Sequence, residues 1–167
     1  MGAADRWVKT KTDYDRNGFV VIPDMLSQED CDRLLVEAAE IGRGNRGAVR
    51  GIAKLPDNLD HTEVLSRYLT VQFPHKASEL IRDEFIAHPA IAKVLSHLIG
   101  PNVKCMQSML FIKPSGKPGQ AWHQDEHFIP TRDRSLAGVW LALDDATIEN
   151  GCLWVRPGSH ADGVIYD

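Results

Sequence analysis

The sequence predicts an α+β fold that is mainly β, with helices in residues 1–100 and strands after them. Before Gly100, apolar residues recur at helical spacing. After it the segments become short, rich in β-branched and aromatic residues, and separated by Gly and Pro. Helices followed by antiparallel-type strands favour a β-sandwich or barrel with helices packed along one side. The 167 residues suffice for one domain with a core of its own.

Composition narrows the function classes. A net charge of −4 and the lack of a basic helix argue against a nucleic-acid partner. No apolar run approaches the ~20 residues of a membrane span. Three widely spaced cysteines argue against a disulfide framework, and the polar N-terminus lacks the apolar centre of a signal peptide. These features predict a cytoplasmic protein, and they leave its oligomeric state open.

The first elements are a strand and a helix. "GFVVIP" (18–23) predicts a short entry strand. "SQEDCDRLLVEAAEIG" (27–42) predicts a helix with Ser27 as its N-cap, Asp30 completing a capping box, and Gly42 as its stop. Residues 43–58 are rich in Gly and Arg and predict a loop. That loop is either simply solvated or a binding site for an anion.

Two more helices and four strands follow. We expect a helix over about 76–87 and another from Pro89 to the residues before Gly100. The strand candidates are 102–113, 121–128, 137–145 and 152–155, the last after an Asn150-Gly151 turn. Trp122 and Trp154 are expected in the core.

The stretch "AWHQDEHF" places His123 and Asp125 two residues apart. In a strand, alternate side chains share a face, and their Cα atoms lie about 6.6–6.8 Å apart. An imidazole and a carboxylate can then reach one metal ion, and a distant histidine would complete the facial triad of non-haem iron. By itself His-x-Asp is a weak indication, because the polar face of an ordinary strand has the same pattern.

The surrounding motifs are more specific. Gln-Ser-Met (107–109), His-x-Asp (123–125), Gly-Val-Trp (138–140), Glu-Asn-Gly-Cys-Leu-Trp (149–154) and Pro-Gly-Ser-His (157–160) occur in this order. "DRNGFVVIPDMLSQEDCDRLL" precedes them. With these motifs the chain resembles the phytanoyl-CoA dioxygenase family from about Asp13 onward.

The resemblance implies an iron(II)- and 2-oxoglutarate-dependent oxygenase on a double-stranded β-helix, a jelly-roll variant. Such an enzyme hydroxylates a small molecule or an acyl-CoA with O2, and it forms succinate and CO2. The resemblance assigns iron binding and catalysis to His123 and Asp125. It assigns the 2-oxoglutarate pocket to Lys76, Gln107, Met109 and Trp140. Structural roles compete with these, since Met109 and Trp140 also suit a core and Lys76 a helix surface.

Part of the family pattern has no match here. The family's second iron-binding His lies downstream of Pro-Gly-Ser-His, and an Arg after it pairs with 2-oxoglutarate; this sequence contains neither. A jelly roll needs about eight strands, so we expect a single oxygenase domain lacking its C-terminal strands. Residues 1–100 would form its helical flank and entry strand, and 101–167 the first part of the jelly roll.

Three explanations for the missing residues stay open. The chain is a fragment of a longer enzyme, or an inactive short isoform with a binding or regulatory role. Alternatively, His127, His160 or a partner chain completes the site. From another class, a cupin-like metabolite-binding protein would bind metal without oxygenase chemistry.

Overall fold

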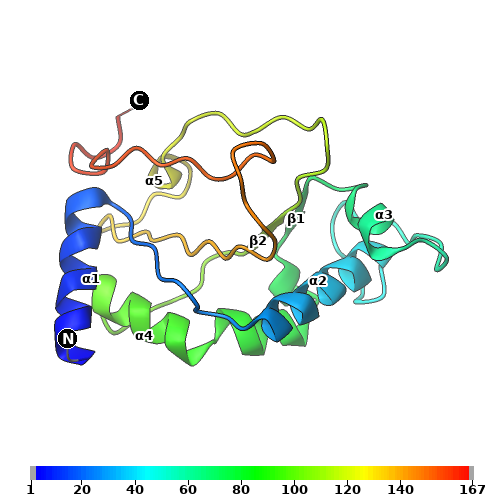
Figure 1. Ribbon diagram of the computed structural model, residues 1–167, viewed down its shortest axis with the longest axis horizontal. Helices are drawn as coiled ribbons and strands as arrows, with labels where there is room; N and C mark the ends of the chain where they lie inside the picture. Colours follow the sequence, from blue (N-terminus) through cyan, green and yellow to red (C-terminus); the bar gives the residue numbers. More distant parts are fainter. Residues whose placement is uncertain (1–2, 166–167) are drawn as a thin grey trace.

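The computed structural model describes residues 3–165, and side chains from residue 7 onward. It confirms an α+β chain, with helices and a small antiparallel sheet. In Figure 1, α1, α4 and α2 form a helical layer. The chain after β2, coloured yellow to red, lies above this layer in the same view. The elements are α1 (Ala3–Asn17), α2 (Gln28–Arg43), α3 (His61–Leu65), β1 (Thr70–Gln72), the 3-10 helix η1 (Pro74–Lys76), the π-helix η2 (Ile81–Ile86), α4 (Pro89–Leu98), β2 (Met109–Phe111) and α5 (Asp125–Phe128).

Helix α2 begins as predicted. The Ser27 side chain accepts a hydrogen bond from the Asp30 backbone N–H at 3.1 Å, and the Asp30 carboxylate accepts one from the Ser27 N–H at 3.0 Å. The helix ends later than predicted, because its left-handed cap is Gly44 (φ 83°). Gly42 serves close packing instead, since a Cβ there would lie only 2.8 Å from Cγ1 of Val64.

The other predicted helices form with changes. The expected 76–87 helix is split into η1 and η2, and the buried Ser78 between them accepts a hydrogen bond from the Ile81 N–H at 3.1 Å. Helix α4 starts at Pro89 as predicted. Helices α1 and α3 were not predicted. None of the helices in residues 3–165 is long and apolar enough to cross a membrane.

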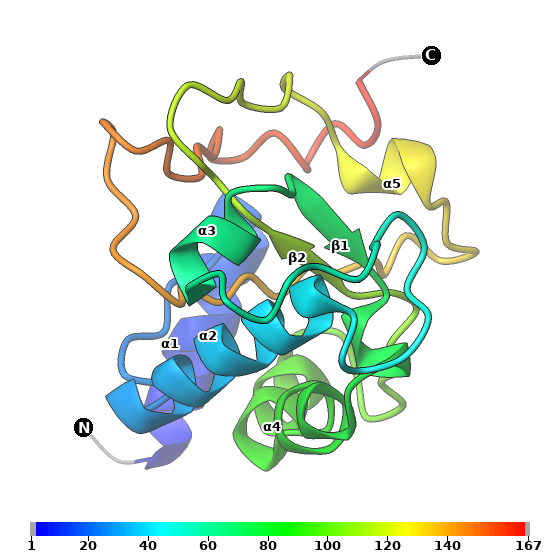
Figure 2. The ribbon, with the colours of Figure 1, turned by 90° about the vertical axis from the view of Figure 1, so that its right-hand side faces the viewer.

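The core lies between α2, β1 and η2. Its buried residues are Leu34, Ile41, Val71, Ile81 and Phe85. Leu110, Ile112, Leu141 and Leu143 pack against them from the second half of the chain. Figure 2 shows the two strands against α2, with α4 beneath. The core is therefore built mainly by the helical layer, and the later segments cover it.

Most predicted strands are not formed. Segment 102–113 contributes only β2, which pairs antiparallel with β1, an element that the sequence analysis missed. Segments 18–23, 137–145 and 152–155 form no strand, and 121–128 ends in helix α5. The prediction of a mainly β chain is thus wrong for residues 3–165. An alternating pattern shows only that a segment suits a sheet; a strand also needs a neighbouring backbone to pair with.

Trp122 and Trp154 are not core residues. Their side chains are 65% and 61% exposed, because in residues 3–165 no layer packs over the segments that carry them. The C-terminal turns are nevertheless attached to the helical layer, at the end of α1. His160 Nε2 donates to the Asp15 carbonyl at 2.9 Å, and the Gly158 N–H donates to the Asn17 carbonyl at 2.8 Å.

Candidate metal and co-substrate site

The structure brings His123 and Asp125 together. Nε2 of His123 lies 3.3 Å from Oδ1 of Asp125. Their convergence was predicted, but the strand geometry behind it is wrong, because Asp125 is the first residue of α5 and no strand contains His123. A turn into a helix, not an alternating strand, makes the two side chains meet.

The hydrogen bonding of His123 fixes which nitrogen faces the carboxylate. Nδ1 lies 2.8 Å from the Ala121 carbonyl oxygen, which can only accept, so Nδ1 carries the hydrogen. Nε2 then faces Asp125 either as the N–H donor of a protonated ring or, in a neutral ring, as a lone pair that a cation between the two groups can bridge. Two ligands of a six-coordinate ion, each bonded at about 2.1 Å and at right angles, lie about 3.0 Å apart. The pair therefore fits a divalent metal ion, and a carbonyl holding the other ring nitrogen is the usual support for a metal-binding histidine.

The ligand set is incomplete. Within residues 3–165 no group of three or more His, Cys, Asp or Glu side chains is placed to hold a metal. His127 lies on α5 and packs its ring against Phe128, with centroids 4.9 Å apart. His160 is bonded to the end of α1. In the part of the chain that the structure describes, neither histidine therefore joins His123 and Asp125 as a third ligand.

Neighbouring residues hold the His123–Asp125 pair. The Gln124 amide, between them, donates to the carbonyls of Ser159 (3.2 Å) and Gly163 (2.8 Å) and accepts from the Ile165 N–H (2.8 Å). These three bonds fix the backbone that carries both candidate ligands.

Gly138 lies beside the carboxylate, because a Cβ there would be 3.7 Å from Oδ2 of Asp125. The Gly-Val-Trp motif thus runs next to the His123–Asp125 pair. Trp140, two residues after Gly138, is 50% exposed, so it is not a core residue.

Three predicted co-substrate residues lie at one end of the β1–β2 pair. Met109 is opposite Gln72 in the register, and the Gln107 amide donates to Sδ of Met109 at 3.5 Å. Lys76 follows β1 on η1, and its Nζ lies 4.3 Å from the centroid of the Phe73 ring. Among the described residues no hydrogen bond, ion pair or ring contact joins this group to His123 or Asp125.

The sequence analysis missed a polar pair within this group. Nδ1 of His75 and Oγ of Ser108 share a hydrogen bond 2.5 Å long. Burial lowers the pKa of His75 from its usual 6.5, and the positive charge of Lys76 lowers it further. No sequence pattern indicated this contact, since its partners lie 33 residues apart and meet only through the β1–β2 pairing.

The arginines of loop 43–58 are largely occupied within the protein. Arg46 donates two hydrogen bonds to the buried Glu37, both 2.9 Å long. Arg43 is itself buried, donates to the Leu59 carbonyl at 2.6 Å and lies 3.3 Å from Glu40. Two of the three arginines of this loop therefore already have partners within the protein, while Arg50 is exposed.

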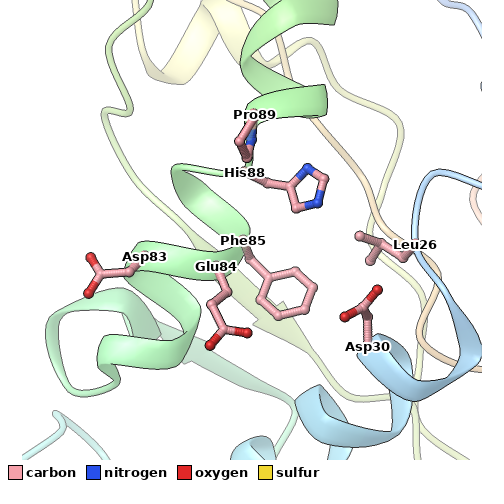
Figure 3. A pocket seen from close by; sticks show the side chains of 7 residues that line it. All are labelled: Leu26, Asp30, Asp83, Glu84, Phe85, His88 and Pro89. Atoms are coloured by element: carbon pink, nitrogen blue, oxygen red, sulfur yellow. The ribbon is translucent and has the colours of Figure 1, made fainter.

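A depression of about 320 Å³ lies elsewhere, between α2, η2 and α4 (Figure 3). Its polar groups already have partners: Asp30 caps α2, Glu84 pairs with Arg33 at 2.5 Å, and Nδ1 of His88 accepts from the Ala90 N–H. The residues lining it are Leu26, Asp30, Asp83, Glu84, Phe85, His88 and Pro89. Nothing in it matches the predicted chemistry.

Comparison with known proteins decides the family. The family described as phytanoyl-CoA dioxygenase (PhyH) matches residues 14–167. The chain belongs to this family. The peroxisomal phytanoyl-CoA dioxygenase of Rattus norvegicus is 34% identical over 158 residues, which cover 88% of this chain and 45% of the relative. A phytanoyl-CoA dioxygenase of Arabidopsis thaliana is 48% identical over 61 residues, which cover 36% of this chain and 22% of the relative.

A second kind of relative bears on the substrate. The "probable alpha-ketoglutarate-dependent hypophosphite dioxygenase" of Stutzerimonas stutzeri is 27% identical over 162 residues, covering 96% of this chain and 56% of the relative. The matches to the rat and Stutzerimonas stutzeri relatives cover nearly all of this chain but only about half the length of each relative. No solved structure matches it.

Proposed function

We propose that this chain forms the first part of an iron(II)- and 2-oxoglutarate-dependent dioxygenase. The observation that carries the proposal is the facing of His123 Nε2 and Asp125 Oδ1 at 3.3 Å, with Nδ1 of the imidazole held by a carbonyl. His123 and Asp125 hold the iron. When bound, the metal supplies the O2 chemistry that side chains lack. The backbone bonds of Gln124 keep the two ligands in place.

The co-substrate would lie against Lys76, Gln107, Met109 and Trp140. The lysine supplies the charge for a carboxylate, and Met109 and Trp140 supply apolar walls that exclude water. These residues form two groups, one beside Gly138 and one at the end of β1–β2.

The remaining ligand and a carboxylate-binding arginine would come from a segment that these 167 residues do not contain. In this proposal residues 1–167 belong to one oxygenase domain, with 1–100 as its flank and 101–167 as the first part of a jelly roll. Support comes from the exposure of Trp122, Trp140 and Trp154, since the missing layer of a jelly roll would cover such side chains.

The substrate proposed is a small molecule or an acyl-CoA. One relative is named for a CoA thioester and another for hypophosphite. Membership of the family therefore does not identify the substrate of this chain. The internal pairing of Arg43 and Arg46 leaves, of the three arginines in loop 43–58, the exposed Arg50 for a CoA phosphate, which weakens the support for an acyl-CoA. A cytoplasmic location also stays a prediction, and a relative is named as peroxisomal.

Succinate formation tests the proposal against its alternatives. A protein that contains residues 1–167 together with the segment proposed to supply the remaining ligand and the arginine is incubated with iron(II), 2-oxoglutarate and O2, beside its His123→Ala variant and the control His127→Ala. We expect succinate from the unchanged protein and from His127→Ala, and none above background from His123→Ala. Metal binding without succinate would favour the inactive isoform or the cupin-like binder. Full succinate formation by His123→Ala would contradict the ligand assignment.

A further inference from the structure

The turn between β1 and η1 has a backbone conformation that few bulky residues adopt. Phe73 has φ 54° and ψ 44°, in the left-handed region. Such a conformation persists where the surroundings fix it, and it is concentrated at functional sites. Here the Phe73 N–H donates to the Ser108 carbonyl at 2.8 Å, and the Phe73 carbonyl accepts from the Lys76 N–H at 2.9 Å.

His75 connects this turn to β2. Its Nδ1 shares the 2.5 Å hydrogen bond with Oγ of Ser108, and its ring meets the Phe73 ring edge-on, with centroids 6.1 Å apart. His75 directly precedes Lys76, and Ser108 lies between Gln107 and Met109. This side-chain contact therefore adds to the backbone pairing of β1 and β2 in holding the predicted co-substrate residues of the two segments together.

The same turn orients the charge of Lys76. The side chain is exposed, and a free lysine of this kind samples many rotamers. Its Nζ instead lies 4.3 Å from the centroid of the Phe73 ring, a cation–π distance. A pre-oriented ammonium binds an anion more tightly, because less freedom is lost on binding.

We propose that His75 is a positioning residue for an anionic co-substrate. Through Ser108 and Phe73 it holds the Lys76 ammonium beside the 107–109 end of β2, where a carboxylate of 2-oxoglutarate binds. This inference rests on the proposed function, which supplies the identity of the dicarboxylate. The geometry of the turn does not depend on it.

A double-mutant cycle tests the inference. In the protein that also contains the proposed segment with the remaining ligand and the arginine, affinity for 2-oxoglutarate is measured calorimetrically without O2, with Mn(II) in place of iron(II). His75→Ala should weaken binding about fivefold, the worth of one hydrogen bond. In a Lys76→Met background it should cost nothing further, because the residue that it positions is gone. Ser108→Ala should match His75→Ala, while Ser108→Thr, which keeps the hydroxyl, and the exposed-histidine control His61→Ala should bind normally.

A second readout needs neither metal nor ligand. In the free protein the Lys76 side-chain protons should show an upfield NMR shift from the Phe73 ring. That shift should disappear in His75→Ala and persist in His61→Ala. Equal losses of affinity in both backgrounds, or an unchanged Lys76 shift in His75→Ala, would overturn the inference. Failure of the unchanged protein to bind 2-oxoglutarate would overturn the proposed function instead, and the shift would still decide whether His75 positions Lys76.

Discussion

Glu37 joins three segments of the helical layer. It lies on α2, is 6% exposed, and accepts two hydrogen bonds from Arg46 of the following loop. The Ser78 hydroxyl, in the turn before η2, also lowers the pKa of this carboxyl. The bond from Arg46 is the main reason why the pKa of Glu37 lies below its usual 4.5. The ionised carboxylate therefore stabilises the fold.

Glu37→Gln should lower the free energy of unfolding by about 2 kcal/mol at pH 7. Breaking a buried pair costs about 3–5 kcal/mol, and the cost is lower here because Arg46 remains partly solvated. Urea denaturation measures it, with Glu79→Gln, whose side chain is 88% exposed, as the matched control. Since the folded pKa is lowered, the difference should shrink as the pH falls below 4.5. An effect equal to that of Glu79→Gln would contradict this role.

His75 should make stability depend on pH. Its pKa in the folded protein lies below 6.5, so the unfolded chain binds more protons as the pH falls through that value. Stability should therefore decrease on acidification from pH 7.5 to 5.5, and less so in His75→Gln. Parallel pH profiles for the two proteins would show that the ring titrates normally.

At the scale of elements, the parts predicted from the sequence are those fixed by local interactions. Helices α2 and α4 carry their own capping residues and apolar periodicity, so both were predicted close to their observed bounds. The β1–β2 pairing joins residues that lie about 40 positions apart in the sequence. The sequence around Thr70 has no pattern that predicts a strand. The His123–Asp125 pair was predicted from a motif. The strand predicted to carry it was wrong, because in the described residues no neighbouring backbone pairs with that segment and Asp125 begins helix α5.

Removal of the α2 capping box tests the local account. Ser27→Ala should destabilise the protein by about 1 kcal/mol, because it leaves the Asp30 N–H without its side-chain acceptor. Ser115→Ala, in an exposed loop, should change stability by less than about 0.5 kcal/mol. Thermal unfolding of the two variants provides the comparison. Equal midpoints would show that the cap contributes nothing to the native state.

At the scale of the whole molecule, the chain has two unequal halves. The helical layer contains the buried core, while the later half presents exposed aromatic side chains, Trp122 and Trp154 among them. The sequence predicted a helical first half correctly, because the helices bury their apolar faces against one another and the small sheet. It could not predict the rest, because a jelly-roll strand is stable only beside strands of the same sheet.

The central claim is that His123 and Asp125 hold a divalent metal, and selective paramagnetic broadening tests it most directly. Traces of Mn(II) are added to the protein while the NMR signals of its seven histidines are followed. We predict that the His123 ring signals broaden first, that Asp125→Asn removes the selectivity, and that added 2-oxoglutarate increases it. Uniform broadening of all seven histidines, unchanged in Asp125→Asn, would contradict the account.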